Sequence, residues 1–225
     1  MAKDLVVLLH GILRSKTDML PLSLYLKKHG FETINLLYPS REKGLEDLTE
    51  YVHEKIQTHL DNGQTLHFVT HSMGGLIARY YIAKYTPKNL GKVVMLAPPN
   101  TGSEFADFFT GNVFLKPWYE KIFGPAGLQL TTAHGTNHPP ITYPVGIIAG
   151  THSINPLAFG VLPSHHDGIV TVERTRLDGM TDHITMPVTH TFMMFNPKVM
   201  SETLEFLNSG SFTTGQARAS GSVRP

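Results

Sequence analysis

The 225-residue sequence contains no cysteine. This absence excludes disulfide bonds, thiolate metal ligands and a cysteine nucleophile. Charge is also scarce, because only 16% of the residues are charged and the formal net charge is +1. A chain with so little net charge lacks the positive electrostatic potential that binds a polyanion, so we do not expect nucleic acid as a partner.

Long apolar runs are missing as well. None approaches the roughly 18 to 20 residues that a helix needs to span a bilayer, so no membrane span is expected. Residues 1–4 lead directly into the apolar run Leu5–Leu9, without the small-residue cleavage site of a signal peptide. We therefore expect a cytoplasmic protein, or a secreted one whose leader has been removed. The sequence does not indicate an oligomeric state.

The chain does contain a regular alternation of strand and helix signals. Short apolar runs, typical of buried parallel strands, are separated by segments whose apolar residues recur every three or four positions. The expected strands are residues 5–9, 31–37, 66–70, 92–96, 143–149, 169–172 and 183–188, and the expected helices are residues 19–28, 45–60, 73–85, 104–109, 115–123 and 197–207. This order predicts an α/β fold in which helices cover both faces of a mostly parallel sheet.

One domain is expected, because a chain of this length with 41% hydrophobic residues is large enough to bury one core. We predict that this domain spans residues 1–208. Residues 209–225 are rich in Ser, Gly, Thr and Arg and show no periodicity. This composition indicates a disordered tail or a remnant of expression cloning.

A serine lies at the junction of an expected strand and helix, in Thr70-His71-Ser72-Met73-Gly74. A reactive serine must project from a tight turn with little steric cover, and small neighbours allow such a turn. Gly74 is one such neighbour, whereas Thr70 stands where the motif has its first glycine, and we expect it to press against a neighbouring strand or helix. A serine that only caps the following helix would give the same pattern, so the motif alone leaves both roles open.

A second glycine motif, His10-Gly11, follows the first expected strand. Glycine lets the backbone pass close to a substrate, so that the N–H groups after it can bind an oxyanion. The expected donors are the backbone N–H groups of Ile12 and Met73, with His10 and Gly11 beside the substrate. A simple turn at the end of a strand is the alternative. Both motifs follow parallel strands, at the sheet edge where ligands bind in such folds.

These motifs resemble those of the serine lipases and esterases of the α/β-hydrolase fold, and of its bacterial lipases in particular. The likeness covers nearly all of residues 5–208 and rests on His10-Gly11-Ile12, Thr70–Gly75, Leu96–Ser103, Asp167–Val170 and Thr189-His190. It implies a catalytic triad in the chain order serine, acid, histidine. It also implies a minimal fold of about six strands, with a short cap segment after the fourth strand, at residues 102–140.

Four aspartates lie between Ser72 and the late histidines: Asp107, Asp167, Asp178 and Asp182. Asp167 is our predicted acid, because Gly168 beside it frees the backbone to turn. Asp178 also precedes a glycine, but its surroundings are typical of a solvated turn. A turn or helix-cap role is the alternative for Asp167.

His190 is the predicted base, because it follows the last expected strand in a loop that could present an imidazole to Ser72. His183 is the main alternative, but it stands at the start of that strand. His165 and His166 adjoin the predicted acid, yet no further ligands stand at metal-binding spacing, so neither a metal nor another cofactor is expected. His71 is expected to pack or hydrogen-bond beneath the serine.

Aromatic residues are concentrated between residues 102 and 123, where the chain has Phe105, Phe108, Phe109, Phe114, Trp118, Tyr119 and Phe123. Two interpretations remain open. The rings line an acyl pocket, with Phe105, Phe108 and Trp118 as substrate-binding residues, or they form the core of two short helices. Because the segment is too short for a large lid, we expect esters of short and medium acyl chains rather than long triglycerides.

The sequence thus predicts a serine hydrolase that cleaves small carboxylic esters or lipids through an acyl-enzyme. A thioesterase, an amidase or an acyltransferase would use the same residues. A non-catalytic binding protein of the same fold is the alternative outside the enzymes.

Overall fold

A computed structural model describes residues 3–59, 63–134, 140–163 and 165–213. Its centre is one six-stranded sheet in the order β2-β1-β3-β4-β5-β6, with every neighbouring pair parallel. The strands are β1 (Leu5–Leu9), β2 (Glu32–Leu36), β3 (Leu66–His71), β4 (Leu90–Leu96), β5 (Val145–Gly150) and β6 (Asp182–Met186). The predicted α/β fold with six parallel strands is confirmed.

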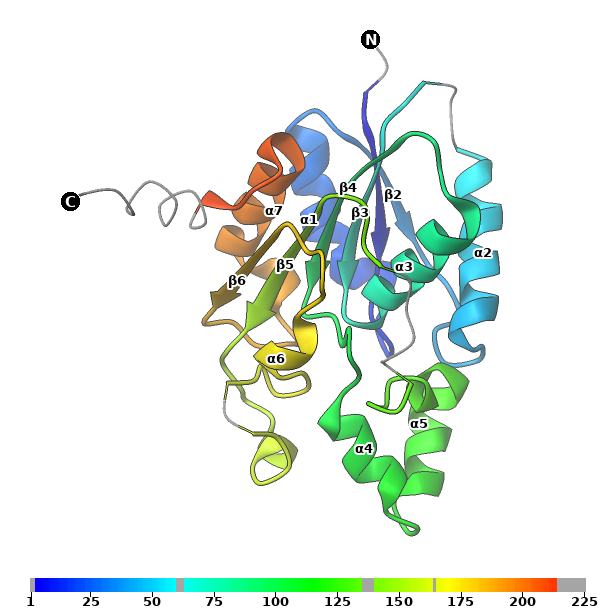
Figure 1. Cartoon of the computed structure of the whole chain (residues 1–225), viewed down its shortest axis with the longest axis vertical. Helices are drawn as coiled ribbons and strands as arrows, with labels where there is room; N and C mark the ends of the chain where they lie inside the picture. The colour runs from blue at the N-terminus through cyan, green and yellow to red at the C-terminus, as the bar shows by residue number, and fades with distance from the viewer. Residues whose placement is uncertain (1–2, 60–62, 135–139, 164, 214–225) are drawn as a thin grey trace, which may run out of the picture.

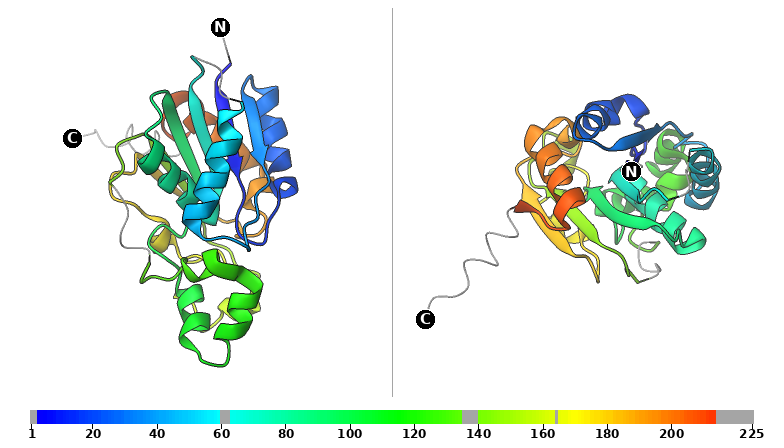
Figure 2. Two further views of the ribbon diagram at one scale, coloured as in Figure 1. Left: turned by 90° about the vertical axis from the view of Figure 1, so that its right-hand side faces the viewer. Right: turned by 90° about the horizontal axis from the view of Figure 1, so that it is seen from above.

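Helices cover both faces of this sheet (Figures 1 and 2). The α-helices are α1 (Lys16–Lys28), α2 (Leu45–Gln57), α3 (Met73–Tyr85), α4 (Glu104–Gly111), α5 (Lys116–Leu128), α6 (Val172–Thr175) and α7 (Pro197–Ser209), and two 3-10 turns are η1 (Pro156–Ala158) and η2 (Met193–Phe195). Helices α2 and α3 pack on one face, and α1 and α7 on the other.

Strand β1 is apolar without interruption. Successive side chains of a strand point to opposite faces. Leu5, Val7 and Leu9 pack in the core under α2 and α3, while Val6 and Leu8 pack in the core under α1 and α7. Since both faces are covered, both sets of side chains must be hydrophobic.

Parallel pairing brings the carboxyl ends of all six strands to one edge of the sheet. Helices α4 and α5 lie beyond that edge, at the lower end of the molecule in Figure 1. They occupy the segment that we expect to form a cap. Chain segments that follow different strands therefore meet in the space between the sheet and these two helices.

The predicted strand at residues 169–172 is wrong. Residues 169–171 form bends and an isolated bridge, and helix α6 begins at Val172. The cause is local, because the backbone N–H groups of Ile169 and Val170 donate to the Asp167 carboxylate rather than to a strand. A backbone bound in this way cannot pair with a sheet.

The C-terminal segment is ordered further than the predicted boundary at residue 208. Helix α7 continues to Ser209, and Phe212 is fully buried against Phe206 of that helix. Residues 214–225 of the predicted tail lie outside the described residues. None of the helices in the described part of the chain combines the length and apolar character that a membrane span needs.

Candidate active site

Ser72 stands on a sharp corner between β3 and α3. Its backbone has φ 53° and ψ −126°, a conformation that costs a non-glycine residue free energy and is concentrated at functional sites. The corner is held from both sides, because the Ser72 N–H donates to Leu96 O (2.8 Å) and its carbonyl accepts from Gly75 N–H (2.9 Å). Ser72 occupies the N-cap position of α3, yet its side chain makes no capping hydrogen bond.

Close packing explains the small residues around this corner. A Cβ at Gly74 would lie 2.5 Å from Leu9 O, and one at Gly11 would lie 3.0 Å from Ser72 Cβ. Larger residues would therefore push the start of α3 and the end of β1 with its following loop apart. Thr70 is fully buried, as expected for a side chain pressed against a neighbour, and its hydroxyl points to Val94 O on β4 (3.5 Å).

The structure brings Asp167 and His190 together, although 23 positions separate them. His190 Nδ1 lies 2.7 Å from Asp167 Oδ2, and the His190 N–H donates to Asp167 O (3.0 Å). The other carboxylate oxygen of Asp167 accepts from Ile169 N–H (3.0 Å) and Val170 N–H (2.8 Å). Since a carboxylate only accepts, the hydrogen of the neutral His190 ring sits on Nδ1 and Nε2 is left as a proton acceptor.

The loop after β1 is braced by His10. Its Nδ1 donates to Gly11 O (2.8 Å), and the same carbonyl accepts from Arg14 N–H (3.2 Å). The His10 ring stacks on Tyr38 with 4.0 Å between centroids, and the Tyr38 hydroxyl donates to His10 O. Burial lowers the pKa of His10, which favours the neutral ring that this packing requires.

A cavity of about 310 Å³ lies at this edge of the sheet. Ser72 and His190 line it together with Ile12, so the predicted nucleophile, the predicted base and one predicted oxyanion donor face the same space. Phe105 of α4 and Tyr119 of α5 line it from the side of the cap segment. The predicted residues His10, Gly11 and Met73 are not among the described residues of the lining.

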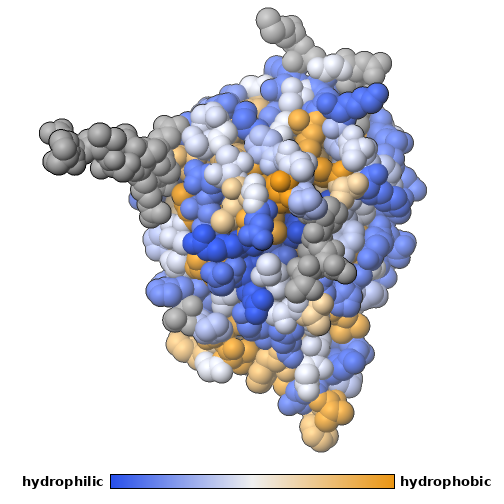
Figure 3. Space-filling view, in the orientation of Figure 1, coloured by the Kyte–Doolittle hydropathy of each residue, from blue (hydrophilic) through white to orange (hydrophobic). Residues whose placement is uncertain are grey.

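The aromatic residues of the cap segment divide into two groups. Phe105, Tyr119 and Phe123 line the cavity and also pack within the cap, with 4.4 Å between the ring centroids of Tyr119 and Phe123. Phe108 and Trp118 are 47% and 66% exposed and do not line the cavity. Apolar residues gather at this end of the molecular surface (Figure 3). The cavity lining and the packing between the two helices therefore share the same rings, whereas Phe108 and Trp118, two of the three predicted substrate-binding residues, lie outside the lining.

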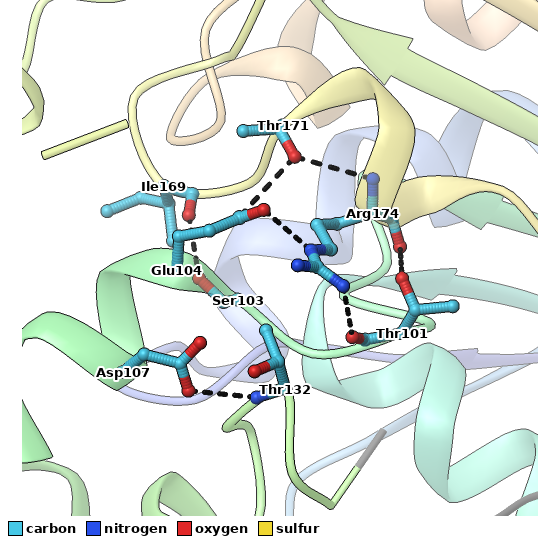
Figure 4. A network of polar contacts seen from close by, with 8 residues as sticks. All are labelled: Thr101, Ser103, Glu104, Asp107, Thr132, Ile169, Thr171 and Arg174. Carbon is cyan, nitrogen blue, oxygen red and sulfur yellow. Dashed lines mark hydrogen bonds and ion pairs between the residues drawn. The ribbon is translucent and has the colours of Figure 1, made fainter. Parts of the chain in front are cut away.

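Polar contacts tie α4 to the loop that carries Asp167 (Figure 4). Arg174 Nε pairs with Glu104 Oε1 at 2.6 Å, and Arg174 Nη1 donates to Thr101 O (3.2 Å). The Ser103 hydroxyl donates to Ile169 O (3.0 Å). Because Phe105 follows Ser103 and Glu104 directly, the network fixes one wall of the cavity relative to the loop that carries Asp167.

A second set of contacts holds α5. Its helical path is broken at Gly124, where φ is 64° and an added Cβ would lie 1.8 Å from Arg41 O. The Arg41 side chain in turn donates to Ile122 O (2.7 Å). Trp118 and Tyr119 lie on the segment before this break, where successive helix residues point in different directions, so Tyr119 lines the cavity while Trp118 is exposed.

His183, the alternative base, lies at the start of β6 and has a different partner. Its Nε2 is 2.9 Å from Thr175 Oγ1, and that hydroxyl donates to Val172 O (2.6 Å), so Nε2 is the donor. His166 Nδ1 accepts from Gly168 N–H (3.1 Å). Among the described residues, no three His, Asp or Glu side chains are arranged to hold a metal ion.

We expect His183 to make stability depend on pH. Burial lowers its pKa to about 4, and the Arg176 guanidinium acts in the same direction. An unfolded histidine has a pKa of about 6.5, so the unfolded chain binds more protons between about pH 6.5 and pH 4 and stability is lost as the pH falls through this range. The free energy of unfolding, measured with urea, should decrease less between pH 7 and pH 5 in His183→Gln than in the wild type. Equal losses in both proteins would contradict the prediction.

Sequence reasoning missed several residues of the cavity. Leu130 and Val170 line it. No feature of the neighbouring sequence predicts this, because the tertiary course of a loop brings each of them to the cavity. Tyr119 also lines it. Its ring was among those expected to line a pocket or to form a helix core, but it was not chosen as a substrate-binding residue, although its four-residue spacing to Phe123 places the pair on one helix face.

Comparisons with known proteins agree with this architecture. The sequence matches the family model described as alpha/beta hydrolase fold over residues 4–144. A search of curated proteins gave no match. Among solved structures, a Bacillus licheniformis lipase in mature form is similar with a TM-score of 0.65 and 22% identity, over 86% of this chain and 87% of the lipase.

Two further structures have other activities in their names. A metagenomic carboxyl esterase is similar with a TM-score of 0.69 and 18% identity, over 84% of this chain and 65% of the esterase. A thioesterase from the prodiginine biosynthetic pathway of Streptomyces coelicolor is similar with a TM-score of 0.59 and 15% identity, over 92% of this chain and 90% of the thioesterase. At these identities the likeness concerns the fold.

Proposed function

Because the chain belongs to the α/β-hydrolase fold family, we propose that it hydrolyses carboxylic esters through Ser72, His190 and Asp167. One observation carries the proposal. Ser72 and His190 line a single cavity, and the His190 ring is held at 2.7 Å by a buried carboxylate that leaves Nε2 free to accept a proton. A base oriented in this way beside a serine is the arrangement that activates a hydroxyl for acyl transfer.

In the proposed reaction, Ser72 Oγ attacks the ester carbonyl while His190 Nε2 takes the hydroxyl proton. Asp167 stabilises the imidazolium that forms. The backbone N–H groups of Ile12 and Met73 bind the oxyanion, aided by the positive end of α3. His190 then gives its proton to the departing alcohol, and an acyl-enzyme remains. Water, deprotonated by His190, releases the acid and restores the serine.

The acyl group is proposed to occupy the side of the cavity formed by the cap. Its apolar and aromatic lining suits a hydrocarbon chain, and a volume of about 310 Å³ favours short and medium chains over long ones. Thioesters present the same carbonyl to the same groups. A thioesterase is therefore the second candidate, supported by the solved thioesterase that shares the fold.

Labelling with a fluorophosphonate tests the proposal, because this reagent reacts only with an activated serine. We expect one labelled peptide, containing Ser72, and hydrolysis of nitrophenyl esters that stops on labelling. A parallel panel of thioesters and amides ranks the alternatives by kcat/KM. A folded protein that takes up no label and hydrolyses none of these substrates would support a binding protein instead.

Truncating Phe105 should change the preference for acyl chain length. Phe105→Ala removes a side chain from the cavity wall, so we expect kcat/KM for longer nitrophenyl esters to rise relative to acetate and butyrate. Phe108→Ala is the matched control, because Phe108 lies on the same helix with its ring exposed. The pocket assignment fails if the two variants show the same chain-length profile as the wild type.

A further inference from the structure

His71 contacts three of the chain segments that carry proposed catalytic groups. It ends β3 directly before Ser72, and its ring is 1% exposed. A Cβ added at Gly11 would lie 3.1 Å from His71 Nδ1, so the ring rests against the loop after β1. On its other side, His71 Nε2 lies 2.9 Å from the carbonyl oxygen of His190. One side chain therefore connects the nucleophile, the oxyanion loop and the base.

The hydrogen bond to His190 defines the state of the His71 ring. A carbonyl oxygen only accepts, so Nε2 must carry the hydrogen. Nδ1 is buried and has no hydrogen-bond partner among the described residues, which suits an unprotonated nitrogen. Burial lowers the pKa of His71 well below its usual range, and the charges of His190, Arg14 and His10 act in the same direction. The ring is therefore neutral at pH 7.

The base is anchored through its backbone as well as through its ring. Two hydrogen bonds, from its N–H and its Nδ1, join His190 to Asp167. The bond from His71 Nε2 to its carbonyl joins it to the strand that carries Ser72. The contacts with Asp167 hold the imidazole ring, while the contact with His71 holds the backbone of His190 at the end of β3.

We propose that His71 is a positioning residue, whose Nε2–H fixes the backbone of His190 at the distance that proton transfer from Ser72 requires. The inference rests on the proposed function and assigns one more residue to the same site. A neutral ring suits this role, because a cation at His71 would oppose the imidazolium that forms on His190 during acyl transfer.

Loss of this bond should reduce kcat more than it changes KM, because His71 is assigned to the base and not to the substrate. A displacement of about 1 Å in a catalytic group can cost on the order of a hundredfold in rate. His71→Phe keeps a buried ring without the donor, and His71→Asn places its amide too far from the carbonyl. We expect both to lower kcat by about tenfold to a hundredfold.

His71→Gln is the rescue variant, because its amide nitrogen reaches the position of Nε2 and can donate to His190 O. We expect it to recover most of the kcat that His71→Asn loses. Rates are expressed per active serine, titrated with fluorophosphonate, so that misfolded protein does not contribute. Equal kcat in the Gln and Asn variants, or wild-type kcat in the Phe variant, would overturn the inference.

His67→Phe provides a matched control on the same strand. His67 is also buried, and its Nδ1 accepts a hydrogen bond from Lys92 N–H (2.9 Å), but it lies at the opposite end of β3. We expect this variant to lower the melting temperature and to keep kcat per active serine. A similar loss of kcat in His67→Phe would show that the effect at His71 is one of general stability.

A measurement on the wild type decides the question if the variants do not fold. Long-range proton–nitrogen NMR of the protein labelled with nitrogen-15 histidine should show His71 as a neutral ring with its hydrogen on Nε2 at pH 7. A hydrogen on Nδ1, or a charged ring, would refute the inference. The proposed function is separable, since Ser72→Ala that retains activity refutes both, whereas an inactive Ser72→Ala with a fully active His71→Phe refutes only the role of His71.

Discussion

Ser72→Ala is expected to lower kcat for ester hydrolysis by on the order of a million-fold, the loss seen when the nucleophile of a comparable triad is removed. The physical reason is that no acyl-enzyme can form without Oγ, and water bound in the cavity is a poorly placed substitute. The remaining rate should reflect the oxyanion donors and substrate binding alone. Steady-state kinetics with a nitrophenyl ester, and stopped-flow detection of the acyl-enzyme burst, measure the change.

Ser23→Ala is the control for this experiment. Ser23 is a buried serine on α1 whose hydroxyl lies 2.8 Å from Thr33 Oγ1, remote from the cavity lining. We expect it to keep wild-type kcat and to lose only the modest stability of one hydrogen bond, about 1 kcal/mol. Ester hydrolysis that survives in purified Ser72→Ala at more than a small fraction of the wild-type rate would assign the nucleophile to another residue.

Asp167→Asn is expected to lower kcat about ten thousand-fold without unfolding the protein. The amide oxygen can still accept from Ile169 N–H and Val170 N–H, so the loop keeps its shape. The amide nitrogen, however, would face His190 Nδ1 in place of the carboxylate oxygen. The imidazole would then carry its hydrogen on Nε2 and could no longer accept the proton of Ser72.

Asp178→Asn is the matched control for the acid, because Asp178 is an exposed residue followed by the same glycine. Its kcat should equal that of the wild type. Circular dichroism and the melting temperature of Asp167→Asn show whether the fold survives. If folded Asp167→Asn retained more than about a tenth of the wild-type kcat, the acid would have to be sought elsewhere.

Much of the fold could be predicted from the sequence, because its signals are local. Strands β1, β3 and β5 are buried along their whole length, and β1 is a continuous apolar run, Leu5–Leu9. Gly74 had a local signal too, because the motif around Ser72 has a small residue at this position. The structure gives the reason, since an added Cβ would lie 2.5 Å from Leu9 O. The one false strand, residues 169–172, consists of β-branched residues, which are typical of strands. Its backbone is occupied by the Asp167 carboxylate, which no composition reveals.

The parallel sheet, the corner at Ser72 and the chain order of the candidate residues could be predicted from the sequence, since each depends on hydrophobic pattern or on small residues within a short segment. The tertiary structure was needed to bring Asp167 to His190 and to show that His71 bonds to the same residue, because loops from different strands must first converge at one sheet edge. It also decided that Phe105 faces the cavity while Trp118 faces outward. That choice follows from the packing of whole helices, which spacing along the chain does not encode.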